Sequence, residues 1–171
     1  MVDLPLLIKE IIKGIDAVIV THLHEDHWDN YTSKSIPKKI QIFVQNTEDK
    51  KTIKSQGFLD VRVVGINIKI KGITITKTIG QHGCEEILSN PNLIDFFGTS
   101  MWFVLRAPGQ KTIYFAGDTI WHEYVELEIN RYKPDLIVLN APKARYEGIK
   151  GSSVMDLKML KNVMNLLKLR K

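Results

Sequence analysis

The sequence predicts a single α/β domain with a mixture of parallel and antiparallel strands. The composition is that of a globular protein, short apolar runs are typical of buried strands, and amphipathic segments typical of helices lie between them. The chain has 171 residues, of which 44% are hydrophobic and 25% are charged. A chain of this length can bury one substantial core. Because no repeat or linker divides it, we expect one domain over residues 1–171.

The first third of the chain alternates helix and strand patterns. Apolar residues at helical spacing predict a helix over 4–13, and Gly14 is suited to end it. Continuous apolar runs predict buried strands over 17–20 and 40–44. A helix over 48–55 follows the second strand, so this part of the chain has a β-α pattern.

The middle of the chain predicts two antiparallel hairpins. Apolar and polar residues alternate over 61–70 and again over 73–79, on either side of a lysine-glycine turn. Apolar runs over 101–105 and 112–115 flank a proline-glycine turn and predict the second hairpin. The remaining sequence predicts a helix over 123–132, a buried strand over 136–139 and a helix over 154–167.

The net charge of +5 is unevenly distributed along the chain. Residues 142–171 contain 8 basic and 2 acidic side chains, whereas the preceding residues contain 16 and 17. Residues 1–141 are therefore nearly neutral. A protein that binds nucleic acid is expected to carry basic charge on its folded surface, so this distribution argues against a nucleic-acid partner. No apolar stretch approaches the ~18 residues of a membrane-spanning helix, and the N-terminus does not resemble a signal peptide. With a single cysteine, these features predict a cytoplasmic protein without a membrane partner.

Chemically reactive side chains concentrate in one segment, Thr21-His22-Leu23-His24-Glu25-Asp26-His27-Trp28-Asp29. Three of the five histidines lie within six positions, and imidazoles and carboxylates are ligands for zinc, with manganese and iron as alternatives. At the end of a strand, His22 and His24 point the same way, while Asp26 and His27 turn toward a second position. This pattern is typical of a site for two adjacent divalent metals that catalyses hydrolysis.

Two further candidate ligands follow predicted strands. His82 comes just after the strand over 73–79, and Asp118 just after the strand over 112–115. Alone, His82 reads as a solvated loop histidine, and Asp118 as a helix cap or turn residue. The histidine cluster favours a ligand role for both.

These residues resemble the HxHxDH signature of the metallo-β-lactamase-fold hydrolases. Trp28 and Asp29 after the signature resemble the branch that contains the L-ascorbate-6-phosphate lactonases. The likeness continues through His82 and the segment 115–119 to about Asp156. The resemblance implies an αββα sandwich and a metal-dependent hydrolase.

The resemblance also implies a role for each residue. His22, His24 and His82 would hold the first metal, Asp26 and His27 the second, and Asp118 would bridge them. Metal-bound hydroxide would attack a small ester, lactone or related acyl substrate, with Asp26 and Asp118 essential to catalysis. Asp29 and Thr119 would orient the ligands through hydrogen bonds, and no organic cofactor is expected. The alternatives are a phosphodiesterase or nuclease of the same fold, or a catalytically poor, truncated relative that binds one metal.

The sequence departs from the family pattern at both ends. Family members carry strands before the first helix predicted here, and a late histidine after the last. The resemblance therefore predicts an incomplete sandwich whose uncovered sheet edges favour a homo-oligomer. His122 or Cys84 could replace the late ligand, although a helix-start histidine and a bystander thiol are the simpler interpretations.

Overall fold

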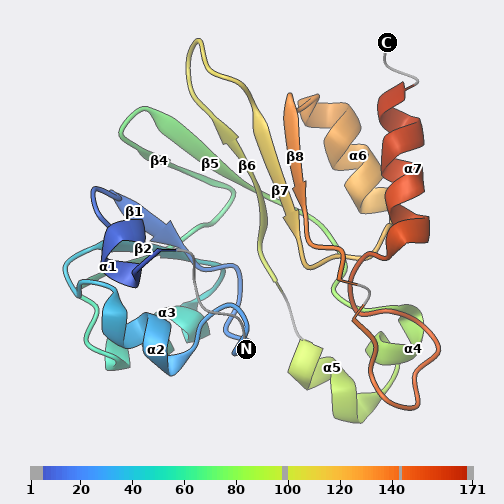
Figure 1. Ribbon diagram of the computed structural model, residues 1–171, viewed down its shortest axis with the longest axis horizontal. Helices are drawn as coiled ribbons and strands as arrows, with labels where there is room; N and C mark the ends of the chain where they lie inside the picture. The colour runs from blue at the N-terminus through green and yellow to red at the C-terminus, as the bar shows by residue number, and fades with distance from the viewer. Residues whose placement is uncertain (1–5, 98–99, 143, 169–171) are drawn as a thin grey trace. The chain divides into compact units, whose positions relative to one another are not determined.

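The computed structural model describes residues 6–97, 100–142 and 144–168. The chain forms two compact units, Met1–Gly65 and Ile66–Lys171, each with its own β-sheet (Figure 1). We describe them separately, and the single domain expected from the sequence stays a prediction.

The first unit contains a parallel sheet of strand order β1-β2-β3. Ile42 pairs with Val18 on one side and with Val61 on the other, so β2 is central and its middle is fully buried. Ile53 and Trp28 pack against this sheet in the core of the unit. Its described elements are α1 (Ile8–Ile11), β1 (Ala17–Ile19), α2 (Asn30–Ser35), β2 (Gln41–Val44), α3 (Thr47–Ser55) and β3 (Asp60–Val63).

The second unit contains a five-stranded sheet of order β4-β5-β6-β7-β8. Its first four strands are antiparallel neighbours, as the two predicted hairpins require, and β8 runs parallel to β7 at the edge. Its strands are β4 (Asn67–Ile70), β5 (Ile73–Thr78), β6 (Trp102–Arg106), β7 (Ile113–Gly117) and β8 (Leu136–Leu139). Its helices are α4 (Glu85–Leu88), α5 (Pro91–Phe97), α6 (Glu123–Tyr132) and α7 (Leu157–Lys168).

Helices α6 and α7 lie against the sheet of the second unit (Figure 1). Val125 and Ile129 of α6 and Val163 of α7 pack on Val104 and Tyr114 in one apolar cluster. Burial of these side chains is the main favourable contribution to holding the helices on the sheet. This packing fixes the ends of β7 and β8, where candidate site residues lie.

Three predicted elements differ from the structure. The segment 61–70 is not one strand, because β3 joins the parallel sheet of the first unit and only β4 forms the hairpin with β5. The strand over 136–139 is not buried, because β8 is an edge strand and Leu136 is 52% exposed. The last helix begins at Leu157 rather than 154, since Val154 and Met155 are buried in the segment that leads into it.

Other helices lie outside the predicted pattern or are shorter than predicted. The first helix covers Ile8–Ile11, and residues 4 and 5 of the predicted helix lie outside the described part of the chain. Helices α2, α4 and α5 were not predicted, because each has at most seven residues and shows too few apolar repeats.

Candidate metal centre

The three clustered histidines of the first unit lie together in the loop after β1. The Nε2 atom of His22 lies 3.0 Å from Nδ1 of His24, and the His22 and His27 ring centroids are 4.1 Å apart. The Thr21 hydroxyl contacts Nδ1 of His22 at 3.0 Å, which fixes the orientation of that ring. His22 is buried and the other two are partly buried, so their nitrogens are grouped at the edge of the unit's core.

A tight turn after His24 brings His27 back to the other two rings. The amides of His27 and Trp28 both donate to the carbonyl oxygen of His24, at 2.9 and 2.8 Å. The indole of Trp28 is buried, and its Nε1 donates to Oε1 of Gln56 at 2.9 Å. Trp28 is therefore a core residue that anchors this turn.

The two candidate acidic residues of this segment, Asp26 and Asp29, lie differently from the histidines. The Asp26 carboxylate is exposed, with Oδ2 3.7 Å from Nε2 of His27. Asp29 caps α2 by accepting from the Thr32 amide, and hydrogen bonds from Thr32 hold the pKa of Asp29 below its ordinary value. The structure thus gives Asp29 a local role, and its predicted orienting role stays a prediction.

In the second unit, His82 and Asp118 face each other. The Nδ1 atom of His82 lies 3.0 Å from the carbonyl oxygen of Ser153. Because a carbonyl oxygen can only accept, Nδ1 carries a proton and donates it to Ser153. Nε2 lies 4.0 Å from Oδ2 of Asp118, and both side chains are largely buried. Nε2 and a carboxylate oxygen therefore point at the same space.

Thr119 joins the two loops that carry these residues. Its buried hydroxyl accepts from the Gln81 amide at 3.0 Å and lies 3.1 Å from the Gln81 carbonyl oxygen. The Ile120 amide donates to the same carbonyl at 2.9 Å. Thr119 therefore positions the backbone next to His82.

Two residues that contact Asp118 were not predicted. Nδ2 of Asn140 donates to Oδ1 of Asp118 at 2.7 Å, and Nε1 of Trp102 donates to its carbonyl oxygen at 3.2 Å. Gly117, at φ +47°, turns the chain at the end of β7 so that Asp118 meets both donors. Asn140 directly follows β8, and the carboxyl ends of the parallel strands β7 and β8 lie at the same edge of the sheet. The signal available in the sequence was that Asn140 directly follows a predicted strand, as His82 and Asp118 do.

The proposed substitute ligands have other positions. His122 is the N-cap residue of α6, and its Nδ1 accepts from the Tyr124 amide at 3.4 Å, as the simpler interpretation predicted. Cys84 precedes α4 and packs against the cluster of Ile87, Leu93 and Phe97.

The donors within each unit fit a divalent metal. Two ligand nitrogens on a tetrahedral zinc with Zn–N bonds of ~2.0–2.1 Å lie roughly 3.3 Å apart, close to the 3.0 Å between His22 and His24. A cation between Nε2 of His82 and the Asp118 carboxylate would be attracted by both groups. The Ser153 carbonyl, which accepts from His82, and the Asn140 amide, which donates to Asp118, hold these two ligands, as outer partners do in metal sites.

Comparison with known proteins finds relatives of one family. No family model matches the sequence. The UPF0173 protein YddR of Bacillus subtilis (strain 168) is 41% identical over 140 residues, which are 82% of this chain and 53% of YddR. A UPF0173 metal-dependent hydrolase of Roseiflexus sp. (strain RS-1) is 29% identical over 137 residues, 74% of this chain and 52% of the relative. The chain is related to the UPF0173 metal-dependent hydrolases. It spans about half the length of the curated relatives it matches.

Solved structures agree with this relationship. A possible metal-dependent hydrolase from Veillonella parvula DSM 2008 is 41% identical with a TM-score of 0.95, over 97% of this chain and 63% of that one. An isothiocyanate hydrolase from Delia radicum gut bacteria is 35% identical with a TM-score of 0.87, over 96% of this chain and 62% of the hydrolase. A metallo-β-lactamase-fold protein, YhfI from Bacillus subtilis, is 14% identical with a TM-score of 0.60 over 90% and 61%. The UPF0173-related chain therefore has the predicted metallo-β-lactamase fold.

None of the helices in the described ranges has the length and apolar character needed to cross a membrane.

Proposed function

We propose that the UPF0173-related chain is a metal-dependent hydrolase of small esters, lactones or related acyl compounds. The observation that carries this proposal is the pair His82 and Asp118, whose Nε2 and Oδ2 atoms lie 4.0 Å apart while Ser153 and Asn140 hold their other atoms. Side chains arranged in this way are oriented before any ligand arrives, which lowers the cost of binding a cation.

The resemblance to the metallo-β-lactamase-fold hydrolases implies a metal for each of these ligands. His22, His24 and His82 would hold one metal, Asp26 and His27 a second, and Asp118 would serve both. When bound, a divalent metal supplies Lewis acidity, which activates a water molecule and polarises the electrophilic group of a substrate.

The chain's own residues position these ligands. The Ser153 carbonyl keeps the proton on Nδ1 of His82, so Nε2 is the atom offered to a metal. Asn140 donates to Oδ1 of Asp118 and leaves Oδ2 directed at His82. Thr119 ties the backbone beside both residues, which limits how far they can separate.

The substrate class is supported by the relatives as well as by the site. The 35% identical isothiocyanate hydrolase is named for a substrate with an electrophilic carbon, a feature that isothiocyanates share with esters and lactones. We therefore include phenethyl isothiocyanate with phenyl acetate and γ-butyrolactone among the candidate substrates. Bis(p-nitrophenyl) phosphate tests the phosphodiesterase alternative.

The test combines metal analysis with activity. The full chain, loaded with zinc, manganese or iron, is assayed for bound metal by mass spectrometry and for hydrolysis of the four compounds. We expect one or two metals per chain and turnover of at least one carbon-centred substrate. Absence of bound metal, or turnover of the phosphodiester alone, would overturn the proposal.

Variants assign the effect to the site. His82→Ala should lower both bound metal and turnover, and Asp118→Ala should abolish turnover. His122→Ala is the matched control, because His122 is a histidine of the same unit that caps α6. Equal losses in His82→Ala and His122→Ala would show that the effect is general destabilisation.

A further inference from the structure

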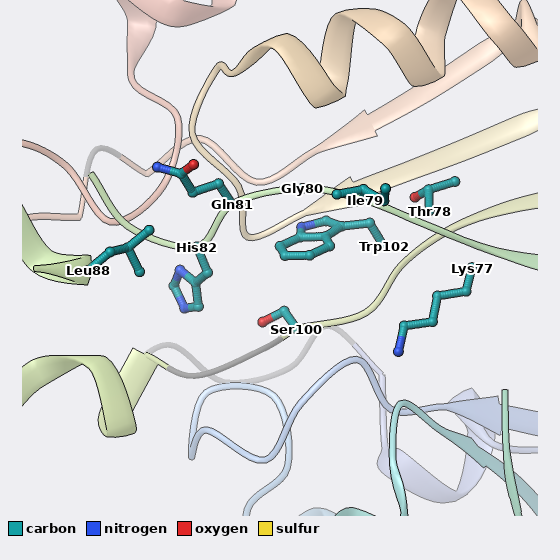
Figure 2. A pocket seen from close by; sticks show the side chains of 9 residues that line it. All are labelled: Lys77, Thr78, Ile79, Gly80, Gln81, His82, Leu88, Ser100 and Trp102. Carbon is teal, nitrogen blue, oxygen red and sulfur yellow. The ribbon is translucent and has the colours of Figure 1, made fainter. Parts of the chain in front are cut away.

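A cavity of about 410 Å³ lies beside His82 in the second unit (Figure 2). Its wall combines the Trp102 indole and the aliphatic side chains of Ile79 and Leu88 with polar side chains, which are Lys77, Thr78, Gln81, His82 and Ser100. Cavities of this size, with apolar walls and a few polar groups, typically bind small molecules.

The indole of Trp102 is held rigidly in this wall. Its Nε1 donates to the carbonyl oxygen of Asp118 at 3.2 Å, so the ring is tied to the chain at a candidate ligand. The ring also lies directly on the backbone of Gly80, where an added Cβ would come within 2.6 Å of two indole carbons. A rigid, flat, apolar ring is therefore presented to the cavity at a fixed place relative to His82 and Asp118.

Ser100 contributes a buried hydroxyl to the wall of the cavity. The side chain is only 3% exposed, and its Oγ has no hydrogen-bond partner among the residues that the structure describes. In Figure 2 the hydroxyl is directed toward the side of the cavity on which His82 lies. A buried hydroxyl without a partner is destabilising, so its place in a cavity wall indicates that it serves a ligand.

We propose that this cavity is the subsite for the body of the substrate, and that Ser100 is a substrate-contacting residue. The inference rests on the proposed hydrolase function and narrows its substrate class. The occupant is a small molecule with a flat apolar body, which lies on Trp102, and one hydrogen-bond acceptor. Ser100 donates to that acceptor and orients the electrophilic carbon beside it toward His82.

The apolar character of the body follows from three of the lining residues. A charged group placed against Trp102, Ile79 and Leu88 loses its hydration without compensation, so the part of the occupant that lies on them is apolar. An apolar aromatic or alkyl group instead gains from leaving water.

Binding of three small probes tests the subsite. Phenylacetamide has both an aromatic body and an acceptor, acetamide lacks the body, and ethylbenzene lacks the acceptor. Their affinities for the zinc-loaded full chain are measured by calorimetry, with substrate turnover recorded in parallel. We expect phenylacetamide to bind at least tenfold more tightly than acetamide, because only phenylacetamide covers the indole.

Two substitutions separate the two contacts. Ser100→Ala should weaken phenylacetamide binding by about tenfold and leave ethylbenzene unchanged, because it removes one hydrogen bond. Trp102→Leu should weaken both. Ser89→Ala, which changes an exposed serine at the end of α4, is the matched control and should alter neither. Thermal melts identify any variant that fails to fold. If Trp102→Leu does not fold, the result for Ser100→Ala alone decides the test.

The outcomes distinguish this inference from the proposed function. If the chain hydrolyses a substrate but Ser100→Ala binds phenylacetamide as tightly as the natural chain does, the subsite is overturned and the proposed hydrolase function stands. Probe binding with the expected dependence on Ser100, but without bound metal or turnover, would support the cavity and overturn the hydrolase. Equal affinity for phenylacetamide and acetamide would overturn the role of Trp102.

Discussion

Replacing Gly80 by alanine tests whether Trp102 is fixed by the backbone beneath it. The backbone of Gly80 lies outside the left-handed region, so alanine can adopt its conformation. The new Cβ would lie 2.6 Å from two indole carbons, whereas ordinary carbon contacts are about 3.5–4.0 Å long. The ring must therefore retreat by roughly 1 Å, which in a packed core costs about 1–3 kcal/mol.

The assay is urea unfolding of the full chain, with thermal melts in support. Gly80→Ala should lower the free energy of unfolding by about 1–3 kcal/mol, which corresponds to roughly 2–4 °C per kcal/mol in Tm for a chain of this size. Gly65→Ala is the control, because a Cβ at Gly65 meets nothing within 4 Å and its φ is not positive. That variant should stay within about 0.5 kcal/mol of the natural chain.

A double substitution shows that the indole is the cause. In the Trp102→Leu background the clash is removed, so Gly80→Ala should cost at least about 1 kcal/mol less than it does alone. The reasoning would be refuted if Gly80→Ala left stability unchanged, or if its cost were the same with and without the tryptophan.

Three further substitutions test the surroundings of the site. Asn140→Ala removes the donor to Asp118 and should weaken zinc binding by about 10–100-fold in a chelator competition, whereas Asn162→Ala on the exposed side of α7 should not. Thr119→Val removes the hydroxyl that joins two loops and should lower the unfolding free energy by about 1–3 kcal/mol; no loss would contradict that role. Burial raises the pKa of Glu128, so its folded form favours the protonated state and stability falls as pH rises above about 4.5. Glu128→Gln should therefore gain stability relative to the natural chain at pH 7 but not at pH 4, and an equal difference at both pH values would contradict this account.

The sequence predicted those parts of the site whose signal is local. His22, His24 and His27 are close in sequence, and a turn of a few residues suffices to group their rings. Asp118 and His82 were chosen as candidates because both follow predicted strands and the histidine cluster favours a ligand role for them. The strand pattern itself was reliable for the hairpins, since alternation and turn residues are also local features.

The parts that could not be predicted depend on contacts between distant residues. Asn140 meets Asp118 only because β8 pairs with β7. The apolar run before Asn140 predicts a strand, but it does not indicate which neighbouring strand that strand pairs with. Likewise, alternation around β3 does not reveal that this strand belongs to the parallel sheet. The unpartnered hydroxyl of Ser100 is visible only once the surrounding wall is known.

The hydrogen bond between His82 and the Ser153 carbonyl makes the orientation of a candidate ligand depend on a distant part of the chain. Seventy-one residues separate the two partners, and Ser153 lies in the buried approach to α7. During synthesis, His82 leaves the ribosome long before the residue that fixes its tautomer, whereas the histidines of the first unit need only their own turn. A metal that binds His82 in its final geometry therefore favours the docked state of the segment before α7, and slower hydrogen exchange there would report occupancy of a site seventy residues upstream.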